Sequence, residues 1–240
     1  GIISTVPKMF IDTFKTLILN HTGSLAMGIV GFILFVLVYL LIVVGVIFEE
    51  SSERRIPIQY SNRTTSAYGQ KQSYIPFKLN SAGVMPVIFA SVILSIPTFI
   101  GGILGNDSGF TKFVTNYINY TTPTGFVLYI ILIFAFGYFY TNMQINPKEL
   151  AKNLNKSGGY IPGIRPGVET EKYIKKILYR ITFLGSTFIA AIAGLPIVFS
   201  SFISTGLPAS VSIGGTGVLI VVGVAIETCK QLESSLINRN

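Results

Sequence analysis

The chain has 240 residues, of which half are hydrophobic and 12% are charged, and its formal net charge is +8. Soluble domains carry about 25% charged residues, so this composition excludes an ordinary soluble fold, and also a disordered or collagen-like chain. A single Cys and a single His exclude an intrachain disulfide, a paired-cysteine metal site and most zinc or His-triad chemistry.

The first 22 residues combine a short apolar run with an amphipathic pattern. The run Gly1 to Val6 is too short to cross a bilayer and is typical of the external end of a span. Apolar residues then recur at helical spacing, at Phe10, Phe14, Leu17 and Ile18. This pattern predicts a helix that either lies in the membrane interface or packs on its neighbours.

Long uncharged stretches occupy most of the remaining chain. A bilayer-spanning helix needs about 20 apolar residues. The sequence therefore predicts an all-α, polytopic transmembrane bundle with spans at 24–48, 80–100, 124–143, 177–200 and 213–232. The span 80–100 contains Pro86 and Pro97, which should bend it and favour a position that faces protein or water rather than lipid.

The positions of Lys and Arg predict the orientation, because cytoplasmic loops are enriched in these residues. Most of the 18 lie in or next to the segments 49–78 and 144–176, or in the C-terminal tail. Only Lys8, Lys15 and Lys112 lie in the alternate segments. We therefore expect two cytoplasmic loops, 49–78 and 144–176, and a cytoplasmic C-terminus.

Catalytic motifs are absent from the sequence: it has no H-E-x-x-H, no G-x-S-x-G and no Walker loop. The segment 144–176 is more informative. Pro and Gly flank Arg165 on both sides, which predicts a stiff, turning loop with a cation near its tip. Such a loop can present Arg165 to an acidic groove or to phosphates, or it can simply be a solvated loop.

Four motifs carry a family resemblance. They are E-R-R-I-P-I-Q-Y (53–60), N-S-A-G-V-M-P-V-I-F-A-S (80–91), N-P-K-E with N-L-N-K-S-G-G-Y-I-P-G-I-R-P-G (146–167), and G-G-T-G-V-L-I-V-V-G-V (214–224). In order and in topology, they resemble the bacterial branch of the SecY family, the central subunits of protein-translocation channels. The resemblance implies a carboxy-terminal half, from the end of the family's fifth span to its tenth, with the amino-terminal half elsewhere.

The resemblance also implies roles for individual residues. The pore ring would contain Ile88 and Ile220, and the lateral gate would contain Asn80 and Pro86. On the residues alone, these isoleucines are ordinary packing or lipid-facing residues, and Asn80 is equally a helix cap. Docking of cytoplasmic partners would use Arg165, Lys148, Lys156, Arg63 and Lys71. The tip between Tyr60 and Ser73 departs from the family, because it is two residues shorter and lacks a pair of arginines.

As a member of this family, the chain would conduct unfolded secretory polypeptides across the bacterial plasma membrane and release membrane proteins laterally into it. It would be no enzyme and would need no cofactor or metal. Its partners would be SecE, SecG, the SecA motor ATPase, the ribosome, signal peptides and nascent chains, anionic lipids, and the N-terminal half of the same channel.

Two other classes of function are open on the residues alone. A solute transporter also uses helices broken by Pro and Gly, but the stretch from Val84 to Ala90 offers almost no polar ligands. A membrane-embedded enzyme would need a nucleophile and a base, and the sequence shows no such pair.

Overall fold

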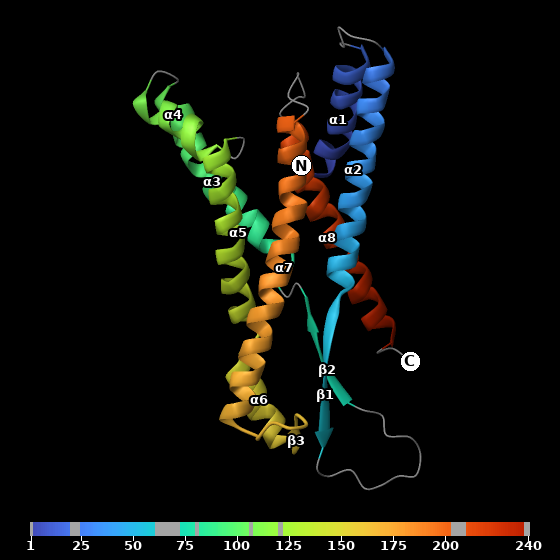
Figure 1. The fold of residues 1–240 in the computed structure, drawn as a ribbon, viewed down its shortest axis with the longest axis vertical. Helices are drawn as coiled ribbons and strands as arrows, with labels where there is room; N and C mark the ends of the chain where they lie inside the picture. Colours follow the sequence, from blue (N-terminus) through green and yellow to red (C-terminus); the bar gives the residue numbers. More distant parts are fainter. Residues whose placement is uncertain are drawn as a thin grey trace.

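The computed structural model describes residues 2–19, 25–60, 73–79, 82–105, 108–119, 122–202 and 210–237. Long helices form most of the molecule, and a small sheet lies near one end (Figure 1). The all-α, polytopic helical fold predicted from the sequence is therefore confirmed, with the sheet as an addition.

The elements follow one another along the chain as α1 (Ile2–Phe14), the π-helical turn η1 (Lys15–Leu19), α2 (Leu25–Ser51), β1 (Glu53–Tyr60), β2 (Ser73–Lys78), α3 (Met85–Leu104), α4 (Gly109–Phe113), the π-helical turn η2 (Val114–Ile118), α5 (Pro123–Gln144), α6 (Pro147–Lys156), β3 (Gly159–Tyr160), α7 (Val168–Phe202) and α8 (Ser210–Ile237).

Four helical segments of the described chain are long and apolar enough to cross a membrane: Gly28–Ser51, Met85–Leu104, Pro123–Lys156 and Val168–Val198. The third of these joins α5 and α6. The fifth predicted range, 213–232, falls within α8, a helix of 28 residues of which only some side chains are described.

The amino-terminal helix α1 packs on its neighbours. The ring of Phe10 lies 5.5 Å from that of Phe35 and 5.7 Å from that of Tyr39, measured between centroids. Phe35 and Tyr39 are buried on α2, and Val222 of α8 packs against the same cluster. The apolar side of α1 therefore faces α2 and α8.

The start of α3 differs from the expectation. The span was predicted from residue 80, with Pro86 inside it, but the helix begins at Met85. Pro86 therefore lies in the first turn, where its missing N–H has no helical partner to lose. It does not bend the helix, and Pro97 is the one interior proline of α3.

Helix α7 begins at Val168, well before the predicted start at residue 177. Apolar length detects the part of a helix that crosses the membrane, and the first turns of α7 are charged. Glu169 and Glu171 lie in the first turn, where carboxylates interact favourably with the helix dipole. The helix thus extends out of the predicted membrane range.

The sheet has the order β2-β1-β3, and both pairings are antiparallel. No strand was predicted in this part of the sequence. Ile56, Ile58 and Phe77 of the hairpin share one buried core with Leu154 of α6 and Ile174 of α7. We call β1, β2, α6, β3 and the first part of α7, up to residue 181, the sheet module.

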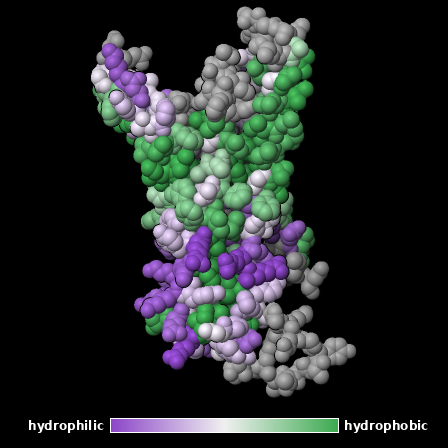
Figure 2. Space-filling view, in the orientation of Figure 1, coloured by the Kyte–Doolittle hydropathy of each residue, from purple (hydrophilic) through white to green (hydrophobic). Residues whose placement is uncertain are grey.

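A second core lies between the long helices and contains Ile42 of α2, Val87 of α3, Ile133 of α5 and Ile189 of α7. Around it, many apolar side chains face outward, such as Leu41 at 64% exposure. Figure 2 shows them as a hydrophobic band above a hydrophilic zone on the face shown. A band of this kind is what a bilayer covers.

Candidate functional site

The candidate site lies where the chain just before α3 meets α8. A Cβ atom added to Gly223 of α8 would lie 2.7 Å from Cγ1 of Val84, the residue before α3. Ordinary van der Waals contact between carbon atoms needs about 3.5–4.0 Å. The absence of a side chain at Gly223 is therefore what lets the two segments approach this closely.

The two predicted pore residues lie close to this contact along their own helices. Figure 1 shows that α3 leads away from the sheet, whereas α8 leads back toward its level. Ile88 follows Val84 by four residues and Ile220 precedes Gly223 by three, which corresponds to about 6 Å and about 4.5 Å along the two helices. Both isoleucines are half-buried.

A groove of about 490 Å³ lies beside the same contact. Its lining includes Val84 and Gly223, the end of β2, the end of α5 and the acidic residues Glu50 and Glu227. The groove is therefore lined both by the end of the sheet module and by the contact of Val84 with Gly223. Sequence reasoning did not single out this groove, because its walls come from four distant segments.

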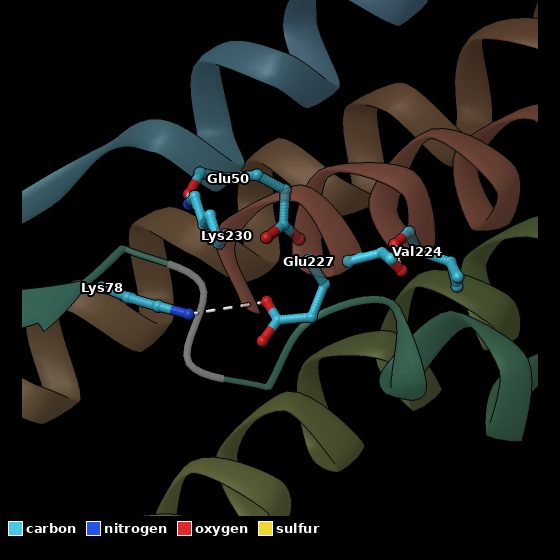
Figure 3. Close-up of polar contacts among 6 residues, drawn as sticks. Glu50, Lys78, Val224, Glu227 and Lys230 are labelled. Atoms are coloured by element: carbon cyan, nitrogen blue, oxygen red, sulfur yellow. Dashed lines mark hydrogen bonds and ion pairs between the residues drawn. The ribbon is translucent and has the colours of Figure 1, made fainter. Parts of the chain in front are cut away.

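Three of the residues that line the groove are charged: Glu50, Lys78 and Glu227 (Figure 3). Lys78 Nζ lies 3.6 Å from Glu227 Oε2, and both side chains are half-exposed. Lys230 of α8 donates a hydrogen bond to the backbone carbonyl of Glu50. An exposed ion pair contributes only about 0–1 kcal/mol. These contacts therefore connect α8 to the hairpin and to α2, but the ion pair adds little to the stability of this arrangement.

The predicted lateral-gate residues are described only in part. Pro86 is fully buried at the start of α3, next to a narrow polar gap lined by Thr141, Thr182 and Ser186. Asn80 lies outside the described residues. The role of both residues at a lateral gate stays a prediction.

The predicted docking residues of the second loop lie in the sheet module. Arg165, Lys148 and Lys156 are all exposed. Gly163 and Gly167 have φ values of +83° and +106°, which L side chains rarely adopt, and they turn the chain on either side of Arg165. Arg63 and Lys71 lie outside the described residues.

Two contacts hold the Arg165 loop on the module. The buried Thr170 hydroxyl donates a 2.9 Å hydrogen bond to the Arg165 carbonyl. The Tyr160 hydroxyl donates to Gln59 Oε1 at 3.1 Å, which joins β3, the strand just before the loop, to β1. The two loops that the sequence separates are thus one surface.

Arg55 is a cation of the same module that sequence reasoning did not single out. Its guanidinium donates to Glu53 Oε1 at 2.7 Å and lies 4.8 Å from the centre of the Tyr74 ring. The hydrogen bond to Glu53 raises the pKa of Arg55. The alternation of Ile56 and Ile58 with exposed residues is the signal that could have identified this strand.

Comparison with known proteins places the chain in a family. A model of the SecY family matches residues 1–229. The chain is 47% identical to the protein translocase subunit SecY of Bacillus subtilis and 45% identical to that of Halalkalibacterium halodurans, in both cases over 100% of the chain and 56% of the relative. The chain thus spans just over half the length of the relatives it matches.

The fold agrees with this comparison. A solved structure described as "The structure of a protein conducting channel" superimposes with a TM-score of 0.56 at 19% identity, over 96% of this chain and 58% of the other. A second, on the plug domain of the SecY protein, gives the same values. At this identity the likeness concerns the fold, whereas the sequence match shows the family. The chain is a member of the SecY family.

Proposed function

We propose that the chain forms part of a protein-conducting channel in the bacterial plasma membrane, with its C-terminus in the cytoplasm. The channel would pass unfolded secretory polypeptides across the bilayer and release membrane proteins sideways into it. The observation that best supports this is the close contact between Val84, the residue before α3, and Gly223 of α8. Ile88 follows Val84 by four residues, and Ile220 precedes Gly223 by three.

In this proposal, Ile88 and Ile220 belong to an apolar ring that seals the resting channel. A narrow apolar constriction excludes water and therefore ions, yet apolar side chains yield to a polypeptide that is driven through. The groove beside the ring is the approach for the polypeptide. Family membership and the apolar character of both helices support this assignment.

The start of α3 forms the lateral gate, with Asn80 and Pro86. An apolar signal sequence that leaves through this gate gains about 0.8 kcal/mol for each CH₂ group transferred from water to lipid. A run of leucines therefore supplies enough free energy to hold a weakly closed gate open. The modest ion pair between Lys78 and Glu227 is in keeping with such a gate.

The chain itself performs no catalysis in this proposal. The energy comes from the SecA motor or the translating ribosome, which dock on the sheet module and its neighbouring loop through Arg165, Lys148, Lys156, Arg63 and Lys71. SecE, SecG and the N-terminal half of the channel surround the helices described here. Signal peptides and nascent chains are the substrates.

The test is the ion leak of the intact channel that contains this chain, reconstituted in liposomes with its partner subunits. Changing Ile88→Asn together with Ile220→Asn should raise the resting leak severalfold, because amides hydrate the constriction. The matched control is Ile103→Asn with Leu232→Asn, on the same two helices at strongly exposed positions. An unchanged leak in the first variant, or an equal rise in the control, would contradict the proposal.

A further inference from the structure

Three hydroxyl groups lie along the seam where α5 packs on α7. A Cβ atom added to Gly137 of α5 would lie 2.4 Å from Oγ of Ser186 on α7, so the close approach depends on the missing side chain. The two helices run in opposite directions (Figure 1), and four residues toward the sheet module on each of them lie Thr141 and Thr182. The side chains of Thr141, Thr182 and Ser186 are buried, at 5%, 6% and 4% exposure.

These hydroxyls differ in how they are satisfied. A hydroxyl within a helix can donate to the carbonyl four residues earlier. Thr141 does so at 2.9 Å, and the exposed Thr187 of α7 does so at 2.7 Å. Among the residues that the structure describes, neither this bond nor any other is found for the hydroxyls of Thr182 and Ser186. A buried hydroxyl without a hydrogen bond is costly in free energy, which points to a partner outside the chain.

Both hydroxyls line the polar gap at the start of α3. This gap has a volume of about 10 Å³. The Thr141 hydroxyl belongs to the same polar wall, and Pro86 of α3 forms part of the apolar wall. None of the described residues that line the gap is charged, so an ion would find no opposite charge there. A buried water needs about 10–15 Å³ and two to four polar partners, which matches the size and the three hydroxyls of this gap.

We propose that the polar gap binds one water molecule, held by the hydroxyls of Thr141, Thr182 and Ser186. The hydroxyls of Thr182 and Ser186 donate to the water oxygen, which satisfies both. The water donates in turn to the oxygen of Thr141, whose own hydrogen is already given to its helix. Three hydrogen bonds are typical of a buried water. The water thus joins α5 to α7 beside the start of α3, and the inference rests on the packing of these helices and not on passage of polypeptides.

A bound water and a dry gap predict opposite effects when one hydroxyl is removed. Thr182→Val keeps the shape of the side chain and removes its hydroxyl. With the water in place, the variant takes away one of its three hydrogen bonds and weakens the site on which Ser186 also depends. The thermal unfolding midpoint of the intact channel, purified with its partner subunits, should therefore fall by several degrees. In a dry gap the same change removes a buried hydroxyl that has no partner, and the midpoint should stay the same or rise.

Two further variants separate the water from other effects of substitution. Thr187→Val is the matched control on α7, because its hydroxyl is exposed and bonded to its own helix, and it should leave the midpoint unchanged. Thr182→Val combined with Ser186→Ala removes both donors at once. Because the two hydroxyls share one water, the double variant should lower the midpoint by less than the sum of the two single variants. Additive losses, or an equal loss in the control, would overturn the proposal.

The water itself can be observed by electron cryo-microscopy of the intact channel, at a resolution that shows ordered waters. The unmodified channel should show density in the gap within hydrogen-bond distance of all three hydroxyls. The variant that combines Thr182→Val with Ser186→Ala should lack it. An unmodified gap without density, in a map that shows other buried waters, would overturn the proposal. So would density that persists in the double variant, since these hydroxyls would then not hold the water.

Discussion

Gly125, in the first turn of α5, is a residue whose importance depends on one backbone atom. A Cβ added there would lie 2.0 Å from the carbonyl oxygen of Asn119. That oxygen already accepts hydrogen bonds from the backbone N–H and the hydroxyl of Thr122, at 2.9 Å and 2.6 Å. Because the obstacle is backbone and is held in place, it cannot rotate away as the end of a side chain would.

Gly125→Ala should therefore destabilise the intact channel by about 1–3 kcal/mol, the usual cost of overpacking. The measurement is the thermal unfolding midpoint of the purified complex, which should fall by several degrees. Gly102→Ala is the matched control, because nothing lies within 4 Å of a Cβ at this exposed position of α3. It should be neutral or slightly stabilising, since Ala favours helix. A midpoint for Gly125→Ala that equals the control would contradict the account.

At the level of single residues, the sequence revealed the composition and the family motifs. It did not reveal which residues come into close contact in the folded chain. Ile88 and Ile220 came from the resemblance, and on the residues alone nothing separates them from other isoleucines. Gly125 and Gly223 matter because of what lies opposite them in space. No local pattern encodes that neighbour, because Val84 and Gly223 are separated by most of the chain.

At the level of elements, the contact between α3 and α8 predicts a specific rescue. Gly223→Ala places a Cβ 2.7 Å from Val84 Cγ1 and should push the start of α3 away from α8. Overpacking costs about 1–3 kcal/mol, so the balance should shift toward the separated arrangement by about 5- to 150-fold. The resting ion leak of the reconstituted channel should rise.

Val84→Ala removes the opposing methyl groups and should return the leak of Gly223→Ala toward that of the unmodified channel. This coupling is specific to two residues in contact, whereas two independent defects would add. Gly102→Ala again serves as the control on α3. A leak that stays high in the double variant would show that Gly223 acts through something other than this contact.

Each predicted apolar run coincides with a helix of the structure, but the helix ends differ from the predicted ends to different degrees. Helix α5 was expected at 124–143 and occupies Pro123–Gln144, because its polar flanks coincide with its caps. Helix α7 extends well beyond its apolar part, since amphipathic turns on a core outside the membrane carry no hydropathy signal. The hairpin was missed because proline is unfavourable within a strand, and each strand contains one. Pro57 of β1 and Pro76 of β2 are nevertheless accommodated in the paired strands, with both side chains exposed.

At the level of the whole molecule, α7 joins the two cores. Ile174 belongs to the core of the sheet module, and Ile189 and Ile197 belong to the core between the long helices. The sequence predicted two separate cytoplasmic loops. It did not predict that β1 pairs with β3, because the paired residues are about a hundred positions apart. The sheet module is therefore continuous with the membrane bundle through α7.

The Arg165 loop tests whether the sheet module is the docking surface. Arg165→Glu reverses the charge of an exposed side chain without touching the core, so the channel should assemble normally while motor-driven secretion falls by about tenfold or more, the cost of a like-charge contact at an interface. Secretion into inverted membrane vesicles, with binding of the motor measured in parallel, provides the readout. Lys112→Glu reverses a charge on exposed α4 and should leave secretion unchanged.

Thr170→Val removes the hydrogen bond to the Arg165 carbonyl but keeps the cation, and should cause a smaller loss. Normal secretion with Arg165→Glu would contradict docking through this charge, and equal losses in Thr170→Val and Arg165→Glu would mean that the conformation of the loop matters as much as its charge.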